Sequence, residues 1–236
     1  MIRLEGINAG YRKFHVLFDI NANMEEKKMT IVVGPNGSGK STILKTIFGL
    51  TNIYSGTVYF KNEKINGLAP HQIARRGVAY VPQTGNVFPN LSVKENLMMA
   101  GYTLHPKEVA RGVDDVIGYY PVLQECFDRR ASTMSGGERQ MLAMAMALIR
   151  KPEVMLFDEP TANLSPKLST QVMDEIVKLR DELGKTIILV EQNAVKALKC
   201  GDRALLLVSG KINYDGLPQD LLNSPELGSL YLGLKK

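Results

Sequence analysis

The chain has 236 residues, enough for one large domain or two small ones, and its hydrophobic content of 44% is typical of a soluble globular protein. A net charge of +5 is compatible with nucleic-acid binding, but charges of both signs are interspersed and no basic run reaches five residues. We therefore expect a solvated surface and no nucleic-acid partner.

Two further features concern the cellular compartment. The two cysteines, Cys126 and Cys200, fit no metal-binding or redox spacing, and so few cysteines indicate a reducing compartment. The longest apolar run, residues 141 to 149, is far below the roughly 18 residues that span a bilayer, and the N-terminus lacks a signal-peptide core. We expect a cytoplasmic protein that associates with the cell membrane peripherally, through partner subunits.

Residues 2 to 23 alternate apolar and polar side chains over part of their length, which predicts short strands of a small antiparallel edge sheet around a turn. Tyr11 follows Gly10 in that turn. An aromatic ring there can stack on a flat ring such as adenine or simply pack against its neighbours, and both readings stay open.

The next stretch is a phosphate-binding loop of the form G-x-x-x-x-G-K-[ST], placed between an apolar run at 29 to 33 and a helix-period run that begins at Ile43. Because the loop lies between a strand and a helix, we reject the alternative that it is an ordinary glycine-rich turn. The loop residues, predicted to bind nucleotide phosphates, are Gly34, Pro35, Asn36, Gly37, Ser38, Gly39, Lys40, Ser41 and Thr42. Backbone N–H groups and the helix dipole favour an anion, while Lys40 reaches the β- and γ-phosphates and Ser41 reaches Mg²⁺.

After the loop helix, residues 56 to 60 alternate as a strand, and residues 70 to 76 form a short helix ended by Gly77. Residues 78 to 81 are a strand that delivers Gln83.

Between residues 84 and 134 the pattern becomes helical, starting at a capping box of Ser92 and Glu95. A loop at 131 to 137 then leads into a helix at 138 to 149, whose Met, Ala and Leu side chains predict that it is buried.

A continuous apolar strand at 154 to 157 ends in Asp158 and Glu159, where α/β sheets bind ligands. A helix capped at Ser165 runs to about residue 183. The later expected elements are a buried strand at 186 to 190 that ends in Glu191 and Gln192, a strand at 204 to 208, and a terminal strand and helix. The alternation of strands and helices predicts a parallel sheet, with no repeats or linkers.

One motif is more specific than the phosphate loop. Ser135, Gly136, Gly137 and the following Glu-Arg-Gln resemble the LSGGQ signature of ATP-binding cassette (ABC) ATPases, at that family's usual distance before the acidic strand end. The resemblance covers the whole chain: an aromatic loop at Tyr11, Walker A at 34 to 42, a Q-loop at Gln83, the signature at 135 to 140, Walker B at Asp158 and Glu159, and a D-loop at 162 to 165.

The resemblance implies a P-loop NTPase of the α/β class, with a RecA-like core, a mainly parallel sheet and an antiparallel β subdomain. It also implies a single ATPase domain over residues 1 to 236, with a helical subdomain inserted at about 86 to 146. The phrases at 158 to 166, 190 to 194 and 230 to 233 are similar to importer ATPases for branched-chain and other hydrophobic amino acids. The sequence departs from the family at Met134, Glu138 and Gln192, where Leu, Gln and the switch His are usual.

The implied activity is Mg²⁺-dependent ATP hydrolysis. In that scheme Lys40 neutralises charge on the phosphates, and Ser41 and Asp158 hold Mg²⁺. Gln83 senses the metal and the attacking water. Glu159 is the general base, and Gln192 takes the switch position. The family also pairs two ATPase subunits, so that Ser135 and Gly137, with Gly136 between them, contact the γ-phosphate bound by the partner.

We therefore expect the ATPase subunit of an amino-acid importer, working with integral-membrane permease subunits, a second ATPase subunit (a copy or a paralogue) and a periplasmic or extracellular solute-binding protein. Residues 84 to 100, with Phe88 and Leu91, resemble the surface that meets the membrane subunits, and local packing is the alternative. The rival functions are an importer for an amide, urea or another solute, and a cassette ATPase without a transporter. No accessory domain favours the second rival.

Overall fold

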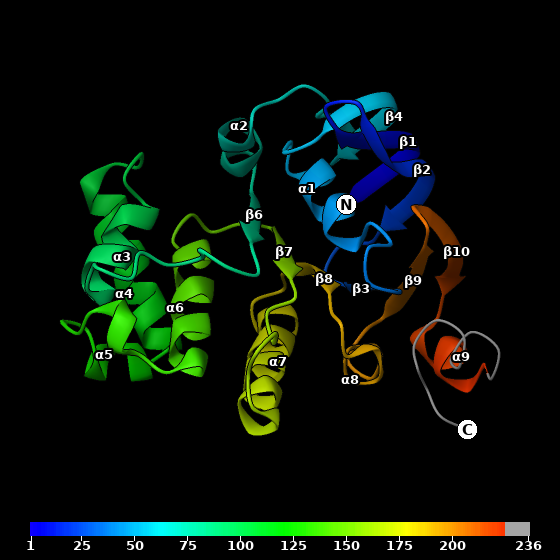
Figure 1. Cartoon of the computed structure of the whole chain (residues 1–236). Coiled ribbons are helices and arrows are strands. Elements are labelled where there is room, and N and C mark those ends of the chain that lie inside the picture. Colours follow the sequence, from blue (N-terminus) through cyan, green and yellow to red (C-terminus); the bar gives the residue numbers. More distant parts are fainter. Residues whose placement is uncertain (225–236) are drawn as a thin grey trace.

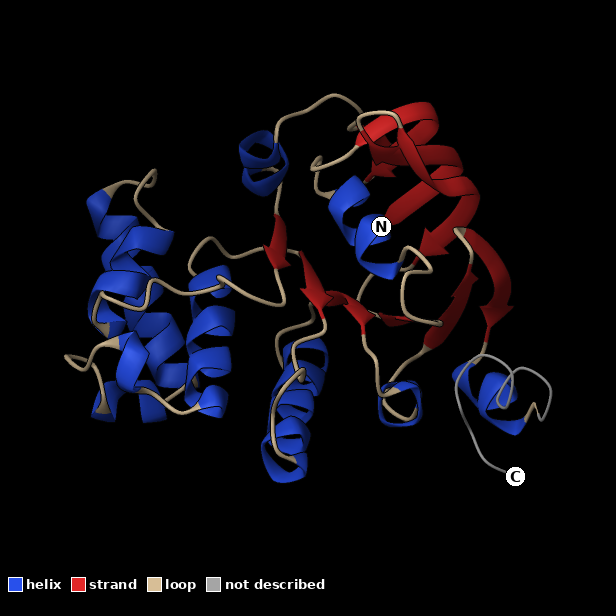
Figure 2. Cartoon of the chain, in the orientation of Figure 1, coloured by secondary structure: helices blue, strands red, loops and turns tan. Residues whose placement is uncertain are grey.

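The computed structural model describes residues 1 to 224, in which the strands form two separate sheets (Figure 2). The larger sheet has six strands in the order β10-β9-β3-β8-β7-β6. In chain order these are β3 (Met29–Val33), β6 (Val78–Val81), β7 (Val154–Asp158), β8 (Thr186–Val190), β9 (Arg203–Val208) and β10 (Lys211–Gly216). Neighbouring strands are parallel except β10, which pairs antiparallel with β9, so the predicted parallel sheet is confirmed.

The strands β3, β7 and β8 are buried along their whole length, as expected for a parallel sheet covered on both faces. Their alternate side chains enter different hydrophobic clusters. Ile31 packs on the side of helix α7 (Pro166–Asp181), whereas Val32 packs on the side of helix α1 (Lys40–Ile47). Figure 1 shows α1 above the sheet, and α7 and α8 (Ala194–Leu198) below it.

The second sheet has four antiparallel strands in the order β2-β1-β4-β5. They are β1 (Ile2–Tyr11), β2 (Phe14–Met24), β4 (Asn52–Phe60) and β5 (Glu63–Lys64). Ile7 and Ile20 of this sheet share a buried cluster with Ile43 and Leu44 of α1. Helix α1 therefore lies between the two sheets, which fixes the loop that precedes it.

Four helices form a group beside the sheet, at the left of Figure 1. They are α3 (Val93–Ala100), α4 (Pro106–Tyr119), α5 (Val122–Glu125) and α6 (Gly136–Leu148), and a 3₁₀ turn, η1 (Ala131–Thr133), precedes α6. The remaining helices are α2 (Pro70–Arg75) and α9 (Pro218–Asn223). The subdomain boundaries at 86 and 146 stay a prediction. No helix in residues 1 to 224 combines the length and hydropathy needed to cross a bilayer.

The observed elements differ from the expected ones mainly at their ends. Helix α6 begins at Gly136, two residues earlier than expected, because the Ser135 side chain accepts a hydrogen bond from the Glu138 N–H and caps it. Strand β4 begins at Asn52 and continues through Gly56, whose φ of 87° accommodates a local irregularity in its pairing. The similarity noted at residues 230 to 233 lies outside the described residues.

Candidate active site

The phosphate loop leaves the carboxyl end of β3 and enters α1 at Lys40. Gly34 has a φ of 149°, and a Cβ there would lie 2.0 Å from the carbonyl oxygen of Leu207, so no larger residue fits. No side chain caps the first turn of α1, whose N-cap is Gly39. The free N–H groups of this turn are therefore available to an anion.

A cavity of about 380 Å³ lies against this loop. It is lined by Val16, Asn36, Gly37, Gly39, Lys40, Ser41, Thr42, Glu159 and Gln192. Gly34, Pro35 and Ser38 shape the loop without lining the cavity. The structure thus brings most of the predicted phosphate-binding residues together with two predicted catalytic residues from the ends of β7 and β8.

Lys40 lies across the loop and is 5% exposed. Its Nζ donates hydrogen bonds to the carbonyl oxygens of Gly34 (2.9 Å) and Pro35 (3.0 Å). Burial lowers the pKa of Lys40, while the carboxylates of Glu159 and Asp158 act in the opposite direction. An anion in the cavity would give this partly desolvated ammonium a charged partner in place of two neutral carbonyls.

Asp158, at the end of β7, is held by two hydroxyl groups. The Ser41 Oγ donates to its Oδ1 at 2.6 Å, and the Tyr80 hydroxyl donates to its Oδ2 at 2.9 Å. Burial, followed by the Asp158 carboxylate, raises the pKa of Tyr80, so the phenol stays protonated and remains a donor. Sequence reasoning missed Tyr80, for which the available signal was a hydroxyl on the otherwise apolar strand β6 that ends just before Gln83.

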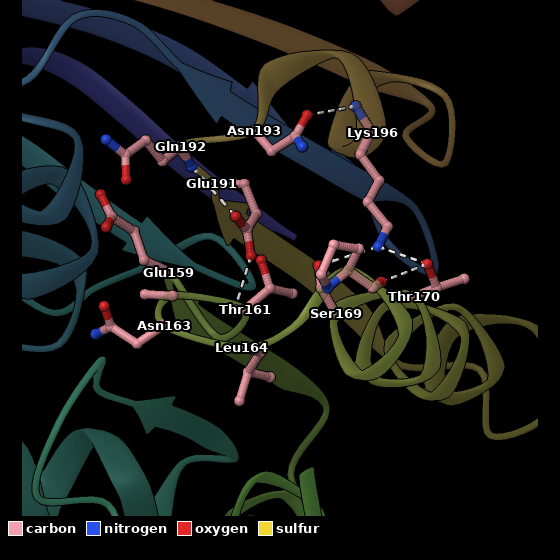
Figure 3. Close-up of a pocket in the computed structure, with 12 residues that line it drawn as sticks. Glu159, Thr161, Asn163, Leu164, Ser169, Thr170, Glu191, Gln192, Asn193 and Lys196 are labelled. Atoms are coloured by element: carbon pink, nitrogen blue, oxygen red, sulfur yellow. Dashed lines mark hydrogen bonds between the residues drawn. The ribbon is translucent and has the colours of Figure 1, made fainter. Parts of the chain in front are cut away.

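Glu159 follows β7 in a left-handed backbone conformation, with a φ of 48°. Its N–H donates to the carbonyl oxygen of Val190, and its Oε2 accepts a hydrogen bond from Gln83 Nε2 at 3.1 Å. Gln192 lines the same cavity as Glu159, and Figure 3 shows the two side chains next to each other. The three residues predicted to act on the attacking water therefore lie together. A left-handed non-glycine residue at this position is strained, as functional residues often are.

Tyr11 lies at the last position of β1 and is 38% exposed. Its hydroxyl is 3.5 Å from the Thr42 Oγ1, next to the start of α1. The ring does not line the 380 Å³ cavity, and its stacking on adenine stays a prediction.

The signature residues lie elsewhere. Ser135 caps α6, and a Cβ on Gly136 or Gly137 would lie 2.7 Å from Leu164 or 2.9 Å from Leu168, respectively. The signature therefore packs against the first turn of α7 and the segment that leads into it, and it is not part of the phosphate-loop cavity. A single chain does not bring its signature to its own phosphate loop.

A second cavity, of about 570 Å³, lies between the segments that follow β7 and β8 (Figure 3). It is lined by Glu159, Thr161, Ala162, Asn163, Leu164, Pro166, Ser169, Thr170, Glu191, Gln192, Asn193 and Lys196. Glu159 and Gln192 line both cavities, so this space continues from the phosphate loop toward the predicted D-loop.

A glycine-rich loop between a buried strand and a helix, with an Asp at the end of another strand of the same sheet bonded to the loop Ser, defines the class of P-loop nucleotide triphosphatases. Within that class, residues 17 to 162 match the family model described as ABC transporter.

Relatives support this match over nearly the whole chain. The chain is 49% identical to a probable branched-chain amino acid transport ATP-binding protein, LivF, of Archaeoglobus fulgidus, covering 99% of both chains. It is 38% identical to the high-affinity branched-chain amino acid transport ATP-binding protein BraG of Pseudomonas aeruginosa, covering 99% of this chain and 100% of that protein. The fold resembles the crystal structure of a nucleotide-free ATP-binding cassette from an ABC transporter, with a TM-score of 0.88, 23% identity and coverage of 100% and 99%. The chain belongs to the ABC transporter family as an ATP-binding ATPase.

Proposed function

We propose that the chain is the ATP-hydrolysing subunit of an importer for branched-chain or other hydrophobic amino acids. The names of the two relatives, matched along their full length, support the substrate class. The observation that carries the activity is the Ser41–Asp158 bond beside Glu159, Gln83 and Gln192 at the phosphate-loop cavity.

Mg²⁺ fits this donor set. The Ser41 hydroxyl and the Asp158 carboxylate are hard oxygen ligands that already meet at 2.6 Å. Among residues 1 to 224 no three His, Cys, Asp or Glu side chains gather to hold a metal, which agrees with a site completed by phosphate oxygens and water. When bound, Mg²⁺ would neutralise charge on the phosphates. Gln83 adds a side-chain oxygen next to Glu159 and is the third candidate for this site.

The protein groups divide the remaining work. Lys40 and the N–H groups of the loop bind the phosphates and stabilise charge that develops on them. Glu159 accepts a proton from the attacking water. The Gln83 amide orients the Glu159 carboxylate by donating a hydrogen bond to it at 3.1 Å. Gln192 hydrogen-bonds the γ-phosphate or the water, and because an amide does not titrate, this position adds no ionisation to the pH profile.

The site is completed by a second ATPase subunit. In one chain Gly136 and Gly137 pack on Leu164 and Leu168, away from the phosphate-loop cavity, whereas Ser135 is exposed and can contact a nucleotide held by another subunit. We take a second copy of this chain as the partner, and a paralogous cassette is the alternative that a failed self-pairing test would favour.

The helical group offers a surface for the membrane subunits. Phe88, Met98, Met99 and Tyr102 are exposed large side chains, and an apolar groove of about 420 Å³ between α3 and α4 adjoins Met98 and Tyr102. Patches of this kind mark interaction sites. Docking there would hold the chain at the cytoplasmic face of the membrane beside permease subunits that receive substrate from a solute-binding protein.

Uptake by reconstituted vesicles tests the proposal. Vesicles carrying this chain and its membrane subunits, with ATP on the side of this chain and the binding protein on the other, should accumulate labelled leucine, and Glu159→Gln should abolish uptake. Accumulation of a non-amino-acid solute instead would contradict the substrate class, and ATP hydrolysis without any coupled uptake would contradict the importer.

A further inference from the structure

Glu191 is a buried carboxylate to which the proposed mechanism gives no role. It follows the last residue of β8 and is 3% exposed. Glu191 lines the second cavity, and Figure 3 shows its side chain reaching from the segment that carries Gln192 toward Thr161, on the segment that carries Glu159.

Its two carboxylate oxygens accept hydrogen bonds from two backbone N–H groups, one on the segment that follows β7 and one on the next residue of its own segment. The Oε1 accepts a hydrogen bond from the Thr161 N–H at 3.1 Å, and the Oε2 accepts one from the Gln192 N–H at 3.2 Å. The neighbouring Val190 carbonyl accepts a hydrogen bond from the Glu159 N–H. The pairing of β7 with β8 ends at Asp158 and Val190. Beyond it, the Glu159–Val190 backbone hydrogen bond and then the Glu191 side chain still connect the two segments.

This arrangement is costly for the fold. Burial raises the pKa of Glu191. Hydrogen bonding from Thr161 and from the Gln192 N–H opposes this rise, and the nearby Glu159 carboxylate adds to it. Lys196, the cation in the same cavity, donates to Ser169 and Thr170 instead, as Figure 3 shows. Within residues 1 to 224 this buried carboxylate is held by two N–H groups and forms no ion pair, and such unfavourable local arrangements are concentrated at functional sites.

We propose that Glu191 is a positioning residue whose two carboxylate oxygens fix the Glu159 segment and Gln192 at the spacing that ATP hydrolysis requires. The inference rests on the proposed function, because it assumes that Glu159 and Gln192 act on the attacking water. Glu191 itself touches neither of their side-chain ends and is not a catalytic residue.

The geometry makes Glu191→Gln the informative variant. An amide has one acceptor oxygen, so its NH₂ group must face the N–H of either Thr161 or Gln192. One of the two N–H groups loses its hydrogen bond to residue 191, while the side-chain volume is kept. Glu191→Asp keeps both oxygens on a side chain shorter by one methylene, and Glu175→Gln makes the same chemical change on α7, where Glu175 pairs with Lys178 outside both cavities.

The experiment measures steady-state ATP hydrolysis by the full chain with Mg²⁺, the ATP affinity and the melting temperature of each variant. Glu191→Gln should lower kcat on the order of tenfold, less than the 10²-fold that a displacement of about 1 Å can cost. The KM for ATP should stay within about twofold, because the phosphate loop is untouched. Glu191→Asp should fall between Gln and wild type, and Glu175→Gln should match wild type.

Three results would overturn the inference: a wild-type kcat in Glu191→Gln, an equal loss of kcat and ATP affinity, or a Glu191→Asp variant slower than Glu191→Gln. Absence of hydrolysis in the wild-type chain would contradict the proposed function, whereas wild-type hydrolysis that persists in Glu191→Gln would contradict this inference alone.

Discussion

The hydroxyl of Tyr80 holds the Asp158 carboxylate from the side opposite Ser41, with its donor 2.9 Å from Oδ2. Tyr80→Phe removes this donor and keeps the ring, which packs against Phe48 with 5.5 Å between centroids. A hydrogen bond to a charged group contributes about 1.5–3 kcal/mol when buried. Because Tyr80 is half-buried, we expect the lower end, which is roughly a tenfold change in an equilibrium constant.

The affected equilibrium is Mg²⁺ binding, since Asp158 is the proposed carboxylate ligand. In a Mg²⁺ titration of ATP hydrolysis, the half-saturating Mg²⁺ concentration of Tyr80→Phe should rise about tenfold with a similar maximal rate. Tyr214→Phe is the matched control, because it removes a hydroxyl that donates at 2.9 Å to Leu217, outside both cavities. An unchanged or lower half-saturating concentration in a correctly folded Tyr80→Phe would refute the role of this hydrogen bond.

Three further changes are predicted. Glu159→Gln should lose about 10² to 10⁴ in hydrolysis rate but bind ATP and pair as an ATP-loaded dimer in size-exclusion chromatography; near-normal turnover would remove Glu159 as the base. Asn96→Ala should lower the free energy of unfolding in urea by about 2–3 kcal/mol, because Asn96 is fully buried and its side-chain oxygen and nitrogen both hydrogen-bond the Phe88 backbone. Asn90 is exposed, so Asn90→Ala is the control, and an Asn96→Ala effect no larger than that of Asn90→Ala would count against the prediction. Because folding raises the pKa of Glu191, the unfolded chain loses the Glu191 proton near pH 4.5, whereas the folded chain keeps it to a higher pH. The stability that the protonated Glu191 contributes at acid pH is therefore lost as the pH rises toward neutral. The melting temperature of wild type minus that of Glu191→Gln should therefore be higher at pH 4 than at pH 7, and the opposite slope would show a lowered pKa.

The sequence predicts the parts of the site that local patterns determine. The phosphate loop, Asp158 and Glu159 follow directly from buried strands and the helix after the loop, and the family resemblance is confirmed by the family match. Tyr80 could not be assigned, because its contact with Asp158 depends on the register of β6 against β7, in which Tyr80 pairs with Leu156. The contact of Glu191 with Thr161 depends in the same way on how the loops after β7 and β8 are placed beyond the sheet.

The signature shows a different limit. Its residues were identified from their order, but the packing of Gly136 on Leu164 requires the position of α6 relative to the segment before α7, which no local pattern specifies. The separation of the signature from the phosphate loop of the same chain follows from that packing. The roles of all the site residues in binding and catalysis, the signature residues included, stay predictions.

The central claim is that two copies of this chain complete each other's ATP sites, and mixing two inactive variants tests it most directly. Lys40→Ala disables the phosphate loop, and Ser135→Arg disables the signature at the cost of one helix cap, about 1 kcal/mol. Each variant alone should be inactive, because both sites of its dimer lack one part. An equal mixture should recover about a quarter of the wild-type rate, since random pairing makes half of the dimers mixed and each of these has one intact site. A mixture that stays inactive although both variants are folded, or full activity of Ser135→Arg alone, would contradict the claim.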